Sequence, residues 1–149
     1  MTQPMKIQHR FAVPDLRLRI HNELAVARRP GGTWLAASTY SNAQATIVLV
    51  RPDGSEMKSI PMPGRKRGGG LMQADAQGFL YCGANSLYRV DPDTAASEML
   101  AGNVIPNDGI WGGGLTSKLA VLGSSTPDNM LVLFDRRTGR VARTIQPLH

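Results

Sequence analysis

Three stretches of the chain share one pattern, in which an apolar run is followed by a turn and a second short run. They read TIVLVRPDGSEMKSI, SLYRVDPDTAASEML and MLVLFDRRTGRVARTI in the 149-residue sequence. Aligning Arg51, Asp91 and Asp135, which follow the apolar runs, gives spacings of 40 and 44 residues. A period of that length is typical of arrays built from four-stranded units. The sequence therefore predicts three copies of one small β unit.

Each copy divides into four short strands separated by turn residues. Gly31-Gly32 and Gln77-Gly78 separate the first and second strands, while Asp53-Gly54, Asp93-Thr94 and Thr138-Gly139 separate the third and fourth. No stretch combines helical periodicity with helix caps, so the predicted fold class is all-β. The predicted strands are residues 23–27, 34–38, 46–50, 55–60, 71–75, 79–83, 86–90, 97–101, 109–115, 119–123, 130–134 and 140–145.

The repeat resembles the blades of the β-propeller superfamily over residues 23–147. The phrase LYRVDPDT, residues 87–94, is similar to the blade ending of gluconolactonase-like, streptogramin-lyase-like and NHL propellers. The resemblance implies three four-stranded antiparallel blades, at about residues 23–62, 69–102 and 109–147. A β-sandwich or an ordinary meander is the alternative architecture.

Three blades are too few for a ring, because propellers close with roughly four to eight blades. Both ends of a three-blade array would also expose apolar blade faces to water. We therefore expect a homodimer in which each chain is half of a six-bladed propeller and a second copy completes the ring. A nine-bladed trimer, a fragment of a larger protein and one part of a heteromer are the alternatives.

Residues 1–22 precede the first predicted blade as an N-terminal segment. Within them, RFAVPDLRLRI at residues 10–20 ends in an alternation of apolar and basic side chains. Such alternation indicates a half-buried strand. We expect the segment to form an extra strand or a clasp at the subunit junction, with a locally folded strand as the alternative.

The net charge of +6 comes from the first 70 residues, which hold eleven Lys and Arg against four Asp and Glu. This asymmetry fits an acidic partner or a basic surface that is simply solvated. No apolar run approaches the roughly 20 residues needed to span a bilayer, and MTQPMKIQHRF lacks the core of a signal peptide. We therefore expect a cytoplasmic protein with no membrane partner. Cys82, the single cysteine, has apolar neighbours and is expected to be buried.

Polar side chains gather where the second-to-third loops and the inter-blade connections meet at one end of the predicted blades. Loops on a rigid scaffold are common binding sites. Asn and Asp are also frequent in turns for conformational reasons alone. Trp34 and Trp111 fall in predicted strands, where a core position is the first expectation, although first strands also line the channel. The predicted ligand-binding residues are Tyr40, Asn42, Asn85, Asn107, Asp108, Trp111 and Asp128.

The densest charge cluster is PGRKRGGG at residues 63–70, which carries Arg65, Lys66 and Arg67. Three cations on a glycine-flanked loop predict an anion site, with a solvated loop as the alternative. The Gly-Lys-Ser/Thr of a P-loop is absent. Aromatic residues make up only 5% of the chain, so nucleic-acid binding by base stacking is not favoured.

The stretch IPNDGIW, residues 105–111, is similar to the Pro-Asn-Asp-Gly phrase of gluconolactonase-like propellers. That resemblance implies Asn107 as a ligand of a divalent metal, with Asp108 in the same pocket. Oxygen ligands suit calcium or magnesium. The family's metal-binding Glu and Asp have no recognisable equivalents here, so we expect no cofactor to be required.

The sequence favours a self-assembling binding module that presents its polar loop face, around the channel, to a small ligand, a sugar or a protein. A metal-assisted hydrolase or lyase, resting on Asn107, is one alternative. Anion or nucleic-acid binding through Arg65–Arg67 is the other. No spacing typical of a catalytic triad or a zinc protease occurs, so whether the protein is an enzyme stays open.

Overall fold

A computed structural model describes residues 19–40, 45–64, 70–105, 109–124 and 129–146, with the backbone alone at 19–22 and 40. Across these ranges the chain forms antiparallel strands and no helix, and so no helix that could cross a bilayer. The strands are β1 (Arg19–Arg29), β2 (Gly32–Tyr40), β3 (Ala45–Val50), β4 (Met57–Pro61), β5 (Leu71–Ala74), β6 (Leu80–Gly83), β7 (Leu87–Val90), β8 (Ser97–Ala101), β9 (Gly112–Leu115), β10 (Leu119–Gly123), β11 (Leu131–Asp135) and β12 (Arg140–Ile145).

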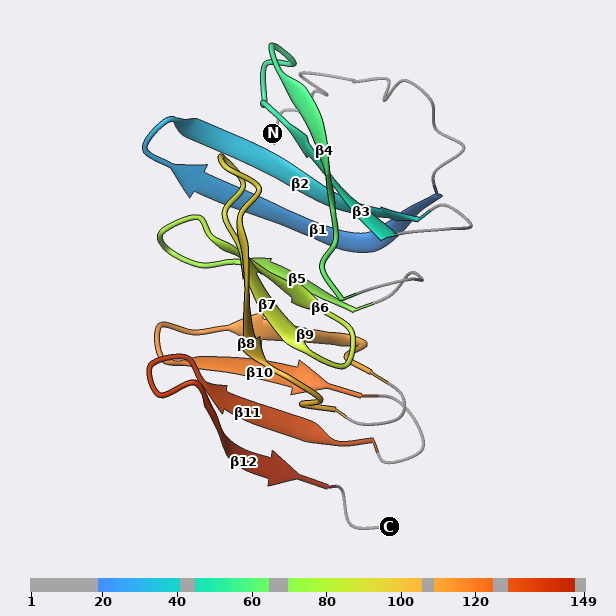
Figure 1. The fold of residues 1–149 in the computed structure, drawn as a ribbon, viewed down its shortest axis with the longest axis vertical. Coiled ribbons are helices and arrows are strands. Elements are labelled where there is room, and N and C mark those ends of the chain that lie inside the picture. Colours follow the sequence, from blue (N-terminus) through green and yellow to red (C-terminus); the bar gives the residue numbers. More distant parts are fainter. Residues whose placement is uncertain (1–18, 41–44, 65–69, 106–108, 125–128, 147–149) are drawn as a thin grey trace, which may run out of the picture.

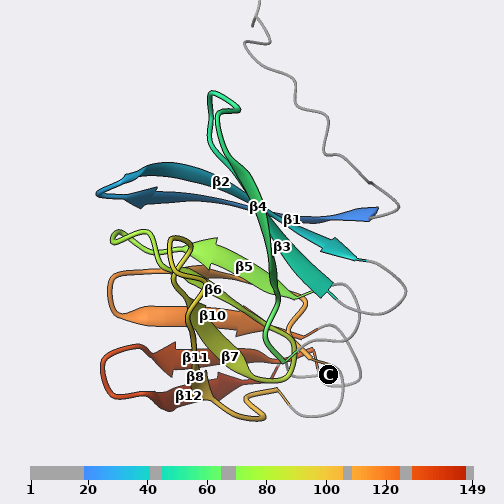
Figure 2. The ribbon, with the colours of Figure 1, turned by 45° about the horizontal axis from the view of Figure 1, so that its top comes forward.

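The strands form three four-stranded sheets, each a simple meander in chain order: sheet 1 (β1–β4), sheet 2 (β5–β8) and sheet 3 (β9–β12). Figure 1 and Figure 2 show the sheets stacked face to face in the order in which the chain makes them. The first strands of the three sheets lie side by side along one edge of the stack, since β5 contacts both β1 and β9. We call this edge the inner edge. The predicted all-β class with three four-stranded antiparallel units is confirmed.

The two largest differences from the predicted strand boundaries are at the beginnings of β1 and β9. β1 begins at Arg19, and Arg19 and Ile20 pair with the last residues of β2 before a bulge interrupts the register. The basic-apolar alternation near this point therefore continues into the first strand, while residues 1–18 lie outside the described part. β9 begins only at Gly112, so Trp111 precedes the strand that was predicted to contain it.

Each sheet has a preceding face, towards the sheet before it in the chain, and a following face, towards the sheet after it. The core between sheets 1 and 2 contains Trp34, Leu49, Leu80 and Cys82. Cys82 has no exposed surface, which confirms the expected buried thiol, and Trp34 is buried as predicted. A second core, between sheets 2 and 3, contains Leu71, Leu122 and Phe134. Both faces of sheet 2 are therefore covered by protein.

The repeated phrase forms the turn between the third and fourth strands of each sheet. One carboxylate oxygen per turn accepts a hydrogen bond from the backbone N–H two residues later: Asp53 from Ser55 at 3.0 Å, Asp91 from Asp93 at 2.8 Å, and Asp135 from Arg137 at 2.8 Å. Asp side chains commonly stabilise turns in this way. Backbone N–H donors near the carboxylates lower the pKa of Asp53, through Ser55, and of Asp135, chiefly through Thr138.

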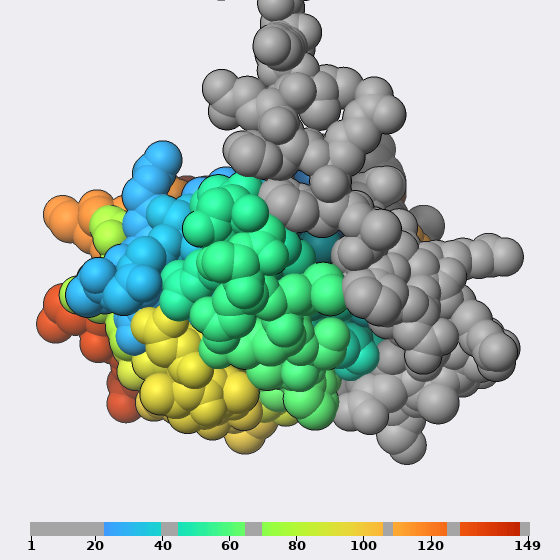
Figure 3. Space-filling view, turned by 90° about the horizontal axis from the view of Figure 1, so that it is seen from above, coloured from blue at the N-terminus to red at the C-terminus, as the bar shows by residue number. Residues whose placement is uncertain are grey.

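An arginine joins sheet 1 to sheet 2 at the end where these turns lie. The Arg29 guanidinium donates to Asp91 at 2.8 Å and to Asp93 at 3.0 Å, and it lies over the ring of Phe79. The indole N–H of Trp34 donates to the other oxygen of Asp93 at 2.7 Å. In Figure 3 the β3–β4 hairpin lies against the β7–β8 hairpin, where Lys58 Nζ donates to the Asp93 carbonyl oxygen.

A second arginine joins sheet 2 to sheet 3 at the same end. Arg136 Nη2 donates to Asp75 at 2.6 Å and to the Tyr81 hydroxyl at 2.9 Å, while Nη1 donates to the Thr116 carbonyl oxygen at 2.6 Å. The Asp75 side chain is only 5% exposed. Each internal junction is thus an apolar core closed at one end by an ion pair between a first-to-second turn and a third-to-fourth turn.

We expect Arg136→Met to lower the free energy of unfolding by about 3 kcal/mol, because it leaves the buried Asp75 carboxylate without its cation. Arg137→Met removes an exposed neighbouring cation and should change the stability by less than about 0.5 kcal/mol. Denaturant titration at one fixed chain concentration measures both. Equal stabilities of the two variants would show that the Arg136 pair contributes nothing.

We expect the stability of the fold to depend on pH through the carboxylate of Asp93. Its pKa is lowered from 3.8, chiefly because the Trp34 indole donates to the carboxylate, with a further contribution from Arg29, while burial opposes the shift. A lowered folded-state pKa means that the charge stabilises the fold above the unfolded-state pKa, and that this contribution is lost as the pH falls through the folded value.

Asp93→Asn should therefore cost about 1 kcal/mol at pH 7. The stability gap between the variant and the wild type should shrink as the pH is lowered from about 5 towards about 2. Thermal unfolding across this pH series measures the gap. A gap that stays constant down to the lowest pH would contradict a role for the Asp93 charge.

Candidate functional site

The two ends of the stacked sheets differ in chemistry. At the turn end lie the short β1–β2 and β3–β4 turns and their counterparts, with the Arg29 and Arg136 ion pairs. At the loop end, the register of each sheet places the end of the second strand, from which the second-to-third loop leaves, beside the start of the first strand. These second strands are β2, β6 and β10, and their ends lie on the same side of the stack (Figure 1). The loop end is the end to which the sequence assigned ligand binding.

Two of the predicted ligand-binding residues have described side chains, and both lie at the loop end. Asn85, between β6 and β7, is exposed, and its carbonyl oxygen accepts a hydrogen bond from Val104 N–H at 2.7 Å. Its side-chain oxygen lies beside Gly109. Trp111 donates its backbone N–H to Gly123, and its side chain is 60% exposed. The core position expected for Trp111 is wrong, since the residue stands just outside β9.

The other predicted site residues lack described side chains. Tyr40 is the last residue of β2, described by its backbone alone. Among the described residues, no group of three or more His, Cys, Asp or Glu is arranged to hold a metal ion. The predicted metal ligand Asn107 lies outside the described residues, so the metal site stays a prediction. The residues outside the described ranges are Asn42, Arg65, Lys66, Arg67, Asn107, Asp108 and Asp128.

On the preceding face of sheet 1, which carries an apolar row, no other sheet formed by the described residues is packed. Val26, Leu35, Val50 and Met57 form one row across the four strands. Val26 is 50% exposed, and Leu24, the next residue of β1 on that face, is 67% exposed. In sheet 2 the corresponding face is the one buried against sheet 1. The row through Val26 and Leu35 thus presents to solvent a surface that sheet 2 uses for packing, whereas Val48 and Thr39, further along the same face, are only 3% and 2% exposed.

The following face of sheet 3 is the second bare surface. Gly114, Val121 and Leu133 form one row, and all three are partly exposed. On the neighbouring row Leu131 is 46% exposed, and its partner Ile145 is exposed as well. The residues of sheet 3 that alternate with these lie in the core shared with sheet 2. The stack therefore has an apolar face at each end.

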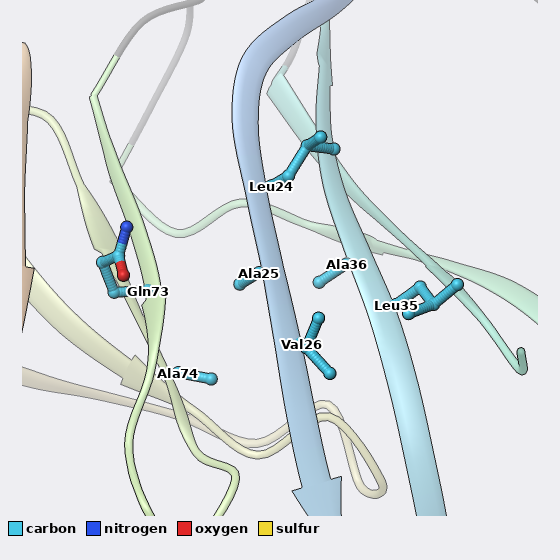
Figure 4. A pocket seen from close by; sticks show the side chains of 7 residues that line it. All are labelled: Leu24, Ala25, Val26, Leu35, Ala36, Gln73 and Ala74. Carbon is cyan, nitrogen blue, oxygen red and sulfur yellow. The ribbon is translucent and has the colours of Figure 1, made fainter. Parts of the chain in front are cut away.

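A hollow of about 450 Å³ lies where the bare face of sheet 1 reaches the inner edge of the stack. Figure 4 shows Leu24 and Val26 on β1, Leu35 on β2, and Gln73 and Ala74 on β5. Apart from Gln73 every side chain at its wall is aliphatic. Such a lining suits apolar atoms of a packing partner better than an anion or a metal ion.

Sequence reasoning did not find the arginines that join the sheets. Arg29 and Arg136 contact carboxylates 62 and 61 residues away in sequence. A repeat aligns equivalent positions within its units and does not specify which turns face each other across units. The apolar end faces did have a signal, because IVLV and LVLF are apolar on both sides of a strand.

No family model matches the sequence, and no curated protein matches it. Among solved structures, 18 chains match the fold. One belongs to a nidogen/laminin complex, which contains a β-propeller, with a TM-score of 0.61 and 13% sequence identity. The match covers 76% of this chain and 43% of that chain. At this identity the likeness concerns the fold alone: the chain forms three propeller-like, four-stranded antiparallel sheets.

Proposed function

We propose that the chain is one half of a six-bladed β-propeller that a second copy completes, and that the assembled ring is a binding module rather than a lone catalytic unit. The observation that supports this most strongly is the pair of bare apolar faces. Sheet 2 buries both of its faces, whereas sheet 1 leaves Leu24, Val26 and Leu35 exposed on its preceding face and sheet 3 leaves Leu131 exposed on its following face. A second copy would cover each bare face with the kind of surface that covers the equivalent face of sheet 2 within the chain.

Closure would remove apolar surface from water at two junctions. Burying a Val or Leu side chain contributes about 1.5–3 kcal/mol relative to leaving it exposed. Leu24, Val26 and Leu35 on sheet 1 and Leu131 on sheet 3 are available for that gain. A twofold axis along the channel makes the two junctions identical, so each favourable contact occurs twice.

Ring closure would also define a binding surface. Six loop ends would surround one channel, and each chain would contribute an exposed Trp111 indole and an exposed Asn85. An indole offers an apolar face with one N–H donor, and a carboxamide both donates and accepts hydrogen bonds. This combination suits neutral polar ligands such as sugars, or short polar segments of a protein.

The assembly is tested by multi-angle light scattering of the purified full chain at micromolar concentration. We expect a mass of twice 16.1 kDa, because two copies close the ring. A mass of 16.1 kDa at every concentration would contradict the two-copy ring.

Binding is tested separately by thermal shift against a panel of neutral mono- and oligosaccharides. A ligand that binds only the folded state raises the unfolding midpoint. We expect Trp111→Ala to abolish the rise for any sugar that binds, whereas Met99→Ala, at a comparably exposed apolar residue of β8, should preserve it. An unchanged rise in the Trp111→Ala variant would move the binding surface away from the loop end.

A further inference from the structure

The structure assigns a specific partner to each bare face. We propose that the preceding face of sheet 1 packs on the following face of sheet 3 of a second copy, in the register that the chain uses at its two internal junctions. In that register Lys118 of one copy meets Asp53 of the other. This inference rests on the proposed two-copy ring and goes beyond it by naming which surfaces and side chains meet.

Strand register identifies the preceding face of sheet 1. Leu35 lies opposite Val50 just as Leu80 lies opposite Val90 in sheet 2, and both valines directly precede the repeat position that ends the third strand. Leu80 and Val90 are buried against sheet 1. By this equivalence, the row through Leu35 and Val50 is the surface on which a preceding sheet would pack.

The same comparison identifies the following face of sheet 3. Val121 lies opposite Leu133, as Ala36 lies opposite Leu49 in sheet 1. Both leucines stand two positions before the repeat position. Ala36 and Leu49 are buried against sheet 2, whereas Val121 and Leu133 are only partly covered. Sheet 3 therefore presents the surface that sheet 1 uses to hold the sheet after it.

The sizes of the first-strand side chains fit this pairing. At Gly113 an added β-carbon would collide with the Val121 carbonyl oxygen and would lie 3.2 Å from a methyl group of Leu71 in sheet 2. Gly112 and Gly114 alternate with it, and a β-carbon at either would meet nothing within 4 Å. Their open side would accommodate Leu24 and Val26, the two exposed large side chains of β1.

The charges at the turn end fit as well. At each internal junction the first-to-second turn of one sheet lies by the third-to-fourth turn of the next, as Arg29 does by Asp93 and Asp75 by Arg136. The corresponding turns at the closing junction are β9–β10, which carries the exposed Lys118, and β3–β4. The latter has the exposed Asp53 at the position that Asp93 occupies in the repeat. The two charges are opposite in sign.

A complementation experiment tests the assignment. Val26→Lys damages only the sheet 1 face and Val121→Glu only the sheet 3 face, so each variant alone has two damaged junctions and should be monomeric. In an equimolar mixture, one junction joins the intact sheet 3 of the first variant to the intact sheet 1 of the second. Native mass spectrometry with one variant isotopically labelled should then show the mixed pair. Met99→Lys, on an exposed residue outside both faces, should remain a pair of copies on its own.

The outcomes separate the two proposals. A wild-type chain that stays monomeric overturns the ring itself. A wild-type pair with a paired Val121→Glu variant, or with monomeric variants that never combine, overturns the joining of sheet 1 to sheet 3. Gly114→Leu provides a second variant whose side chain enters open space in the single chain, so it should keep the wild-type circular dichroism spectrum and yet fail to pair. Pairing by that variant would also overturn the assignment.

The ion pair has its own test by a double-mutant cycle. Asp53→Asn, which keeps the acceptor for the Ser55 N–H, and Lys118→Met should each raise the dissociation constant of the pair of copies about two- to fivefold, as expected of an ion pair at the rim of an interface. The double variant should lose no more than either single variant, because both remove the same interaction. Additive losses in the double variant would remove Lys118 and Asp53 from the junction.

Discussion

The structure depends on the fact that a four-stranded sheet with two apolar faces needs a neighbour on both sides. Sheet 2 meets this requirement inside the chain, with Cys82 buried towards sheet 1 and Leu71 buried towards sheet 3. A stack of three sheets has two junctions and leaves two faces over. Exposed apolar area of this kind is uncommon on a soluble surface unless something binds there. In the proposed ring, a second copy would cover both faces with surfaces of the kind that pack at the two internal junctions.

The internal junctions combine non-directional apolar packing with directional ion pairs at one end. Apolar packing alone would tolerate sliding of one sheet over the next. Arg29 and Arg136 fix the relative position of the turns, because a guanidinium donates to carboxylates in a defined geometry. Placing these contacts at the turn end leaves the loop end, with Asn85 and Trp111, to vary without loss of the scaffold. This division between rigid scaffold and variable loops is common among folds that bind diverse ligands.

Local patterns in the sequence predicted the local features of the fold. Short apolar runs separated by glycine and aspartate turns located all the strands that the described residues form, because both signals depend on neighbours in sequence. Trp111 was misplaced because residues 109–115 were predicted as one continuous strand, whereas β9 begins at Gly112, one residue after Trp111. The partners of Arg29 and Arg136 could not be predicted, since they depend on how whole sheets stack. Of the candidate loop site, only Asn85 and Trp111 have described side chains, and their shared end followed from strand direction.

Small-angle X-ray scattering of the wild-type chain, at concentrations that saturate the assembly, tests the central claim most directly. A closed ring of six sheets is a short, wide particle with a depleted centre, whereas two three-sheet stacks joined at one face form a rod. We expect a scattering curve that fits the ring. A curve that fits a single three-sheet stack at every concentration, or the rod, would contradict it.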